Sequence, residues 1–351
     1  MAKTAVFKNK SEQIFYVEIG KKNNLTDLSP QVFDNDFDGH AKLVLFDVYG
    51  TFYPNHETKP VFYFRHTDIA KNKYRFANIM ELGDGPLSIQ KGSLYPKQLA
   101  DQTTPMNEYR KISNQPLIYG FDSTEPLVQY RLDEDCLQVK EGNFFTLKAE
   151  PWPITIYDHQ STYINSSVIF QPSTWSGQMG GKPFVGLGSY DRFCMKKDAG
   201  SFSDVPLAYT SLCMMGIRED GRKEMVFLSG SYNADGKTIA VYYIDGETPI
   251  SADHFEFEAD WYRLPYVTDE TCIFKTAIVR FGGKEFHFDG KWGTKGFTDQ
   301  PHIEKHGQSQ IVGTWYEGKT AYTHRLSNCW SENMGAFADN LRAWGFDVID
   351  E

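Results

Sequence analysis

The sequence predicts an all-β protein made of two consecutive antiparallel β-barrels with a short C-terminal helix. The chain is rich in residues that favour strands, with 26 Phe, 20 Tyr and 7 Trp among 351 residues. Its second half is divided at short intervals by turns that contain glycine. Strands do not alternate with helices of ten or more residues, which argues against Rossmann and TIM-barrel folds. The length exceeds the size at which a single core stops growing, so we expect two domains.

Six turns of one chemical kind divide the second half. Glycine, often after Asp or Asn, supplies the positive φ that tight hairpins need. The turns lie at residues 219–222, 233–236, 244–247, 281–284, 288–291 and 316–319. Around them lie about eight β-rich runs in up-and-down order, the last of them at residues 319–327. Eight strands close a small barrel that can hold one ligand.

Helical spacing appears near the C-terminus. There Ser331 is placed to cap a helix and Gly345 to end it. The apolar residues that recur at this spacing are Met334, Phe337, Ala338, Leu341 and Trp344.

The first half is also β-rich but has longer polar loops. Charge combines with Gly and Ser at residues 197–206, and we place the domain boundary there. The expected domains are residues 1–200, which carry the candidate pocket, and residues 201–351, a barrel with the terminal helix.

Composition restricts the possible partners. The net charge of −10 disfavours nucleic acids and anionic membranes, which require clustered Lys and Arg. No apolar run approaches the roughly 20 residues of a membrane span, and the first residues lack a signal-peptide core, so we expect a cytoplasmic protein. The sequence does not specify an oligomeric state.

Cofactor motifs are also missing from the sequence. The five cysteines are scattered without a CxxC pair, and we expect them to be reduced, with Cys194 used as a small apolar side chain rather than a nucleophile. Gly186 and Gly188 lack the third glycine and the helix of a dinucleotide fingerprint. We therefore expect no cofactor and no essential metal.

Residues 151–196 mix ionisable groups with large apolar rings, which suggests a lined pocket. Asp158 and His159 are adjacent, so in a strand they point to opposite faces. The candidate pocket residues are Asp158, His159, Tyr163, Asn165, Trp175, Tyr190, Asp191 and Arg192.

Residues 180–192 read GGKPFVGLGSYDR, a hairpin turn that leads into a strand ending in Asp and Arg. This pattern resembles a motif of the lipocalin-like AttH and carotenoid 1,2-hydratase superfamily, which includes tocopherol cyclase and Diels–Alderase relatives. The resemblance implies two consecutive calycin barrels, and it implies that Asp191 is the functional carboxylate. In the hydratase branch the motif continues Asp-His-Asn-Trp-Gly, whereas Arg192, Phe193 and Cys194 follow Asp191 here.

An apolar cavity would allow the Asp191 carboxyl to protonate an alkene or to hold a polar substrate group. The alternative is an ion pair with Arg192 that fixes the end of the strand.

Two further segments leave alternatives open. In HFEFEADW the polar residues alternate with apolar ones, which is typical of a solvated outer face over an apolar interior. If that polar face pointed inward instead, His254 and Glu256 would line the site, where they could bind substrate, act as acid and base, or bind a metal. His302 and His306 stand four residues apart, as metal ligands on a helix do, but a polar loop is the simpler interpretation.

These features predict a cofactor-independent acid–base enzyme of the hydratase, cyclase or isomerase type. Its substrate would be a small, largely apolar molecule such as a terpenoid or polyketide. The alternatives are a non-catalytic carrier of a small apolar or amphipathic ligand, and a carbohydrate-active glycosidase or lyase. The predicted catalytic residues are Asp191, Asp158 and His159. The predicted substrate-binding residues are Tyr163, Asn165, Trp175, Tyr190, Arg192, His254 and Glu256.

Overall fold

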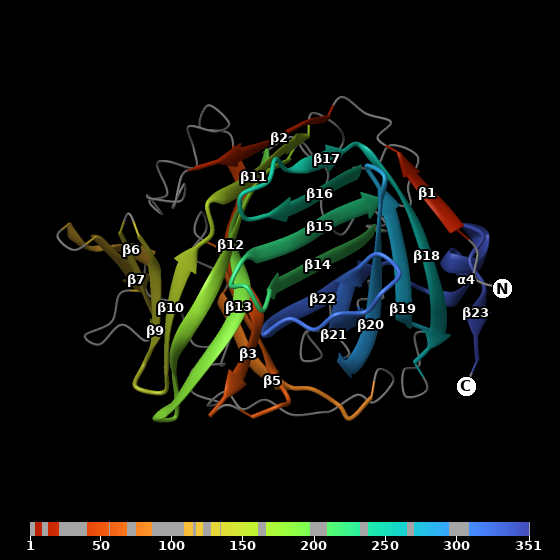
Figure 1. Cartoon of the computed structure of the whole chain (residues 1–351). Coiled ribbons are helices and arrows are strands. Elements are labelled where there is room, and N and C mark those ends of the chain that lie inside the picture. Colours follow the sequence, from red (N-terminus) through yellow and green to blue (C-terminus); the bar gives the residue numbers. More distant parts are fainter. Residues whose placement is uncertain are drawn as a thin grey trace. The chain divides into compact units, whose positions relative to one another are not determined.

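The computed structural model divides the chain into two compact units (Figure 1). The N-terminal unit comprises Gln13–Glu81 and Gly92–Gly200, and the C-terminal unit comprises Met1–Glu12, Leu82–Lys91 and Ser201–Glu351. The first twelve residues belong to the C-terminal unit because β1 (Thr4–Lys8) pairs with β18 (His254–Arg263). The structure describes residues 4–8, 13–20, 41–55, 57–68, 75–85, 109–114, 117–121, 128–133, 135–160, 166–196, 209–231, 238–264, 270–294 and 309–350.

The N-terminal unit is one twelve-stranded sheet in the order β5-β4-β3-β13-β12-β10-β9-β8-β7-β6, with β11 paired to β12 and to β2. Its strands are β2 (Gln13–Ile19), β3 (Ala41–Pro54), β4 (Val61–Asp68), β5 (Arg75–Glu81), β6 (Tyr109–Asn114), β7 (Leu117–Phe121), β8 (Val128–Leu132), β9 (Leu137–Glu141), β10 (Phe145–Pro151), β11 (Ile154–Gln160), β12 (Ser166–Met179) and β13 (Lys182–Lys196).

The C-terminal unit is one eleven-stranded sheet in the order β1-β18-β19-β20-β21-β22-β14-β15-β16-β17, with β23 paired to β18. Its other strands are β14 (Tyr209–Ile217), β15 (Lys223–Ser231), β16 (Thr238–Ile244), β17 (Ile250–Ala252), β19 (Cys272–Phe281), β20 (Lys284–Thr294), β21 (Ser309–Glu317), β22 (Leu326–Met334) and β23 (Val348–Ile349).

Both units share one topology. In each, the first strand of an antiparallel meander pairs with the last, β3 with β13 and β14 with β22, as in an up-and-down barrel. In the part of the chain that the structure describes, the ladder of the N-terminal unit is interrupted between its third strand, β5, and β6, and that of the C-terminal unit between its fourth strand, β17, and β18. Each sheet carries its own hydrophobic cluster. The predicted all-β fold class is confirmed, and so is the up-and-down order of eight long strands in the second half.

The predicted C-terminal helix is present but short, α4 (Ala338–Ala343), and it ends at Gly345 with a φ of 92°. Ser331 does not cap it, because β22 extends to Met334 and pairs with β14 over that length. Among the described residues, no helix is long and apolar enough to cross a membrane.

Turn glycines are placed as predicted at four positions of the second half, where φ is positive: Gly221, Gly246, Gly282 and Gly318. The turn at residues 233–236 lies outside the described residues. The turn predicted at residues 288–291 is wrong, because Gly290 continues β20 through a register shift and lies against Ile311.

The strand predicted at residues 319–327 is displaced along the chain. Residues 319–325 form an irregular connection, and the strand itself is β22. The displacement arises because Tyr322 and His324 of this connection bond to a buried carboxylate on β15 instead of joining a ladder.

The glycines of the 180–192 motif make room for a side chain. A Cβ on Gly188 would lie 2.2 Å from the indole of Trp175, and one on Gly50 would lie 2.5 Å from the Cα of Gly188. Trp175 is 1% exposed, and its indole N–H donates to Ser173 at 2.9 Å. The close approach that these glycines permit is therefore made by Trp175 across β13 and β3.

The sheet changes partner at the segment Pro151–Pro153. Since proline has no N–H to donate, the ladder of β12 passes from β10 to β11 at this point. Gln171 bridges the gap: its amide donates to the carbonyls of Trp152 and Ile154, both at 2.9 Å, and accepts a hydrogen bond from Thr155. This buried amide holds β11 at the edge of β12.

The packing of Trp175 on Gly188 gives a first prediction. Gly188→Ala should destabilise the fold by about 1–3 kcal/mol, because the added methyl overpacks the indole. Urea unfolding followed by tryptophan fluorescence measures the loss. The double variant Gly188→Ala/Trp175→Leu should lose less stability than the sum of the losses of the two single variants. A loss equal to that sum would contradict the contact.

Candidate functional site

Strand β13 places Asp191 and Arg192 on opposite faces of the N-terminal sheet. It pairs in register with β12 on one side and with β3 on the other. Tyr190 and Cys194 belong to the hydrophobic cluster, so their face is the cluster face, and Arg192 shares its parity. Asp191 lies on the opposite face. A single pocket in the cluster therefore cannot be lined by both residues, nor does the strand align them as an ion pair.

Asp191 lies within a row of polar residues. Its register partner on β3 is Asp47, and the register partner of Asp47 on β4 is His66. The hydroxyl of Tyr49 donates to Oδ2 of Asp191 at 2.7 Å, and Nδ1 of His66 lies 2.8 Å from Oδ1 of Asp47. We call Tyr49, Asp47, His66 and Asp191 the polar row.

The polar row is surrounded by apolar side chains. Asp191 is 9% exposed, and the side chains of Asp47 and His66 are 14% and 17% exposed. The aromatic ring of Phe64 stacks on both Tyr49 and His66. Other buried apolar residues of this face are Phe62, Ile154, Ile156, Phe170 and Leu187. Carboxylates held among such groups are available for proton transfer without competition from bulk water.

Two predicted catalytic residues lie on β11. Asp158 is 5% exposed and shares the face of Asp191, because Ile156 pairs with Phe170 and Phe170 with Asp191. Strand β12 separates the two carboxylates, and Asp158 is offset by two residues along the strands, so their backbones lie about 12 Å apart. His159 has the opposite parity, as the sequence predicts. Its side chain, and the residues Tyr163 and Asn165, lie outside the described part.

Trp175 and Tyr190 lie on the cluster face, where a second polar group is buried. Arg65 and Glu141 form an ion pair with both side chains fully buried, and the hydroxyl of Tyr63 donates to the same carboxylate. Burial, followed by the Glu141 charge, raises the pKa of Tyr63 well above its ordinary value. This group is held by strong mutual bonds, which suits it to ordering the core.

His254 and Glu256 lie away from both groups. Strand β18 alternates exposed polar and buried apolar residues, so the polar face is the outer one, as the simpler interpretation predicts. The Nδ1 of His254 lies 2.9 Å from Asp253, and its side chain is 58% exposed. The inverted orientation that would let these residues bind substrate is not the one observed. His302 and His306 lie outside the described residues.

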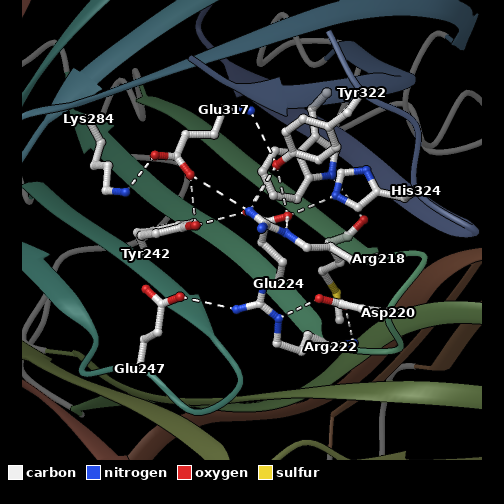
Figure 2. A network of polar contacts seen from close by, with 12 residues as sticks. Arg218, Asp220, Arg222, Glu224, Tyr242, Glu247, Lys284, Glu317, Tyr322 and His324 are labelled. Carbon is white, nitrogen blue, oxygen red and sulfur yellow. Dashed lines mark hydrogen bonds and ion pairs between the residues drawn. The ribbon is translucent and has the colours of Figure 1, made fainter. Parts of the chain in front are cut away.

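The C-terminal unit holds a polar network that the sequence analysis does not predict (Figure 2). At its centre, the Glu224 side chain is fully buried. Nε of Arg218 donates to Glu224 at 2.8 Å, and so do the hydroxyls of Tyr242 and Tyr322, at 2.9 and 3.0 Å to Oε1. Nε2 of His324 lies 3.0 Å from Oε2. Glu317 joins through Tyr242 and through Lys284.

The network around Glu224 fixes a charge rather than transferring protons. Burial raises the pKa of Glu224, but the hydrogen bonds from His324 and Arg218 outweigh it and lower the pKa to about 2. The carboxylate therefore stays ionised at all ordinary pH values. It ties the connection at residues 319–325 to β15. One sequence signal could have found it: Arg218 and Glu224 flank a predicted hairpin turn, so they meet across it.

The described residues were also compared with the requirements of a metal site and of a reactive thiol. No group of three His, Cys, Asp or Glu side chains is placed to hold a metal ion there. The five cysteines are free and buried, and Cys194 packs within the hydrophobic cluster.

Comparisons with known proteins gave structural likenesses only. No family model matches the chain, and no curated protein matches its sequence. A candidate AttH protein from Nitrosomonas europaea aligns at 13% identity and a TM-score of 0.41, over 86% of this chain and 94% of that one. Kievitone hydratase from Nectria haematococca aligns at 8% identity and a TM-score of 0.41, over 94% of this chain and 98% of that one.

CghA aligns at 11% identity and a TM-score of 0.43, over 92% of this chain and 98% of that one. At these identities the likeness concerns the fold and not the chemistry.

The depressed pKa of Glu224 gives a second prediction. Since its folded pKa is about 2 and its ordinary value is 4.5, the stabilisation is complete above pH 4.5 and is lost as the pH falls toward 2. The contribution amounts to about 3 kcal/mol. Glu224→Gln should remove it at pH 7 and flatten the pH dependence of urea unfolding between pH 4.5 and 2.5.

The matched control is Glu247→Gln, which removes an exposed carboxylate at the edge of the same network. It should change the free energy of unfolding by less than about 1 kcal/mol. A Glu224→Gln variant with the unchanged pH dependence of the wild type would contradict the depressed pKa.

Proposed function

We propose that the chain is an acid–base enzyme of the hydratase, cyclase or isomerase type, with Asp191 as its proton-transferring carboxyl. The observation that carries the proposal is the polar row, in which Asp191 and Asp47 face each other on neighbouring strands among buried apolar side chains. Directly opposed like charges are unfavourable in a sheet. The unfavourable pair is therefore expected to serve a function. Proton transfer to an apolar substrate is the function that fits the apolar side chains around it.

The surroundings also favour one class of substrate. Phe64, Phe170 and Leu187 offer apolar contacts around the row, while Tyr49 supplies an oriented hydroxyl. A small, largely apolar molecule that carries an alkene or carbonyl matches this combination. Terpenoids and polyketides are molecules of this kind.

The two alternatives fit the site less well. In a glycosidase both carboxylates must flank a sugar, whereas here Asp47 lies 2.8 Å from the ring of His66 and Asp191 accepts a hydrogen bond from Tyr49. A carrier has no use for opposed carboxylates, because binding alone requires no proton transfer. Asp158 shares the face of Asp191 and is proposed to border the same site. The opposite face of the sheet, which carries the hydrophobic cluster, holds Trp175, Tyr190 and Arg192.

The proposal predicts solvent proton transfer to substrate. The protein, incubated in D₂O with a panel of polyene terpenoids and polyketides, should yield products that carry solvent deuterium or added water, detected by mass spectrometry. Asp191→Asn should lower the rate by about 10²–10⁴ while preserving the melting temperature, because the amide oxygen still accepts from Tyr49. The control Glu150→Gln removes an exposed carboxylate of the same unit and should be fully active.

Other outcomes discriminate between the functions. A ligand that binds tightly without turnover indicates the carrier. Release of sugar from an oligosaccharide indicates the carbohydrate-active alternative. A folded, fully active Asp191→Asn variant would remove Asp191 as the acid, and a variant with a lowered melting temperature and normal turnover would mark it as structural.

A further inference from the structure

We infer that His66, oriented by Asp47, is the second proton-transferring residue of the site and acts as the base opposite Asp191. The inference rests on the proposed function, because a base is needed only if Asp191 donates a proton. It concerns residues that the sequence motif does not include, since His66 and Asp47 lie more than a hundred residues before Asp191.

The sheet brings the three residues into one line. Asp47 is the register partner of Asp191 on one side and of His66 on the other. Side chains directly opposite on neighbouring antiparallel strands have Cβ atoms about 4.5–5.5 Å apart. An acid at Asp191 and a base at His66 therefore lie about 10 Å apart, with Asp47 between them.

The contact with Asp47 selects the useful form of the imidazole. A neutral histidine that donates from Nδ1 to a carboxylate has its lone pair on Nε2, which can then accept a proton. Nδ1 of His66 lies 2.8 Å from Oδ1 of Asp47, which sets the carboxylate on the Nδ1 side of the ring and leaves Nε2 facing away from it, although this oxygen makes no hydrogen bond of ordinary geometry among the described residues. Asp47 is thus a positioning residue, and it stabilises the imidazolium after transfer, as the carboxylate does in a Ser-His-Asp triad.

The surroundings of His66 hold the ring in place. Its ring stacks on Phe64 with centroids 6.0 Å apart, and its register partner on β5 is Phe76. Two carboxylates lie in line with it on the neighbouring strands, Asp47 directly opposite and Asp191 one strand further. The ring is mostly buried yet 17% exposed, so a ligand can reach it.

The protons balance over a hydration. Asp191 in its acid form gives a proton to the alkene carbon, and a water molecule adds to the resulting cation. The proton that this water loses goes to Nε2 of His66. Return of that proton through solvent restores the acid form of Asp191, so an alkene and one water give one alcohol. An isomerisation differs only in that His66 removes a proton from carbon instead of from water.

The first experiment needs no substrate. In protein with ¹⁵N-labelled histidine, long-range ¹H–¹⁵N correlation identifies the tautomer of each ring, and His66→Gln assigns the signal of His66. We expect a proton on Nδ1 and none on Nε2 at pH 8. A proton on Nε2 with a bare Nδ1, or an imidazolium that persists at pH 8, would overturn the inference.

The second experiment measures turnover against pH with the substrate found in the D₂O panel. His66→Gln should lower turnover by about 10²–10⁴ and remove the limb of the pH profile that reports the base. Asp47→Asn should lower turnover less and shift that limb, because the base remains but loses its orienting partner.

The chain offers a matched control in His254, whose Nδ1 makes the same contact with Asp253 at 2.9 Å but on an exposed face. His254→Gln should leave turnover and its pH profile unchanged. If Asp191→Asn is inactive while His66→Gln keeps full turnover and the wild-type profile, the inference fails and the proposed function stands. Absence of turnover in the wild-type protein overturns both.

Discussion

The ladder of β13 is the constraint on which the N-terminal unit depends. This strand pairs with β12 from Lys182 and with β3 from Phe184, and both pairings continue in register past Arg192. Gly50, Gly186 and Gly188 let the strands and the Trp175 indole approach so closely that a single Cβ at Gly188 would lie 2.2 Å from the ring. A register slip of one residue would exchange the two faces of the sheet and would drive side chains into this contact. The tight packing therefore fixes which residues share a face.

The polar row follows from that fixed register and from the topology. Tyr49 and Asp191 are 142 residues apart in sequence, and they meet because the first strand of the meander pairs with the last. The same pairing sets Asp47 against Asp191, and the hairpin from β3 to β4 adds His66. Long-range pairing, not local sequence, thus assembles the candidate site.

The origin of the site explains how far the sequence could predict it. Local patterns identified the strands of β18 and β19, the turns at Gly221 and Gly246, and the opposite orientations of Asp158 and His159, because each depends on neighbours in the chain. The sequence also indicated Asp191. It could not indicate Asp47 or His66, since nothing local shows that β3 lies beside β13. It also misplaced the eighth strand of the second half, because Tyr322 and His324 fit a strand pattern and are used instead to bind Glu224.

The polar row and the Glu224 network hold their carboxylates in different ways, and the difference separates a structural role from a chemical one. Glu224 is bonded to an arginine, two tyrosines and a histidine, and those bonds lower its pKa to about 2, so its proton is out of reach. Asp191 and Asp47 face each other on neighbouring strands, with Tyr49 donating to Asp191 and His66 beside Asp47, and a tyrosine and a histidine are themselves proton donors and acceptors. The first arrangement stabilises one charge state. The second brings together groups that can exchange protons, which is why we propose the polar row, and not the Glu224 network, as the site of the chemistry.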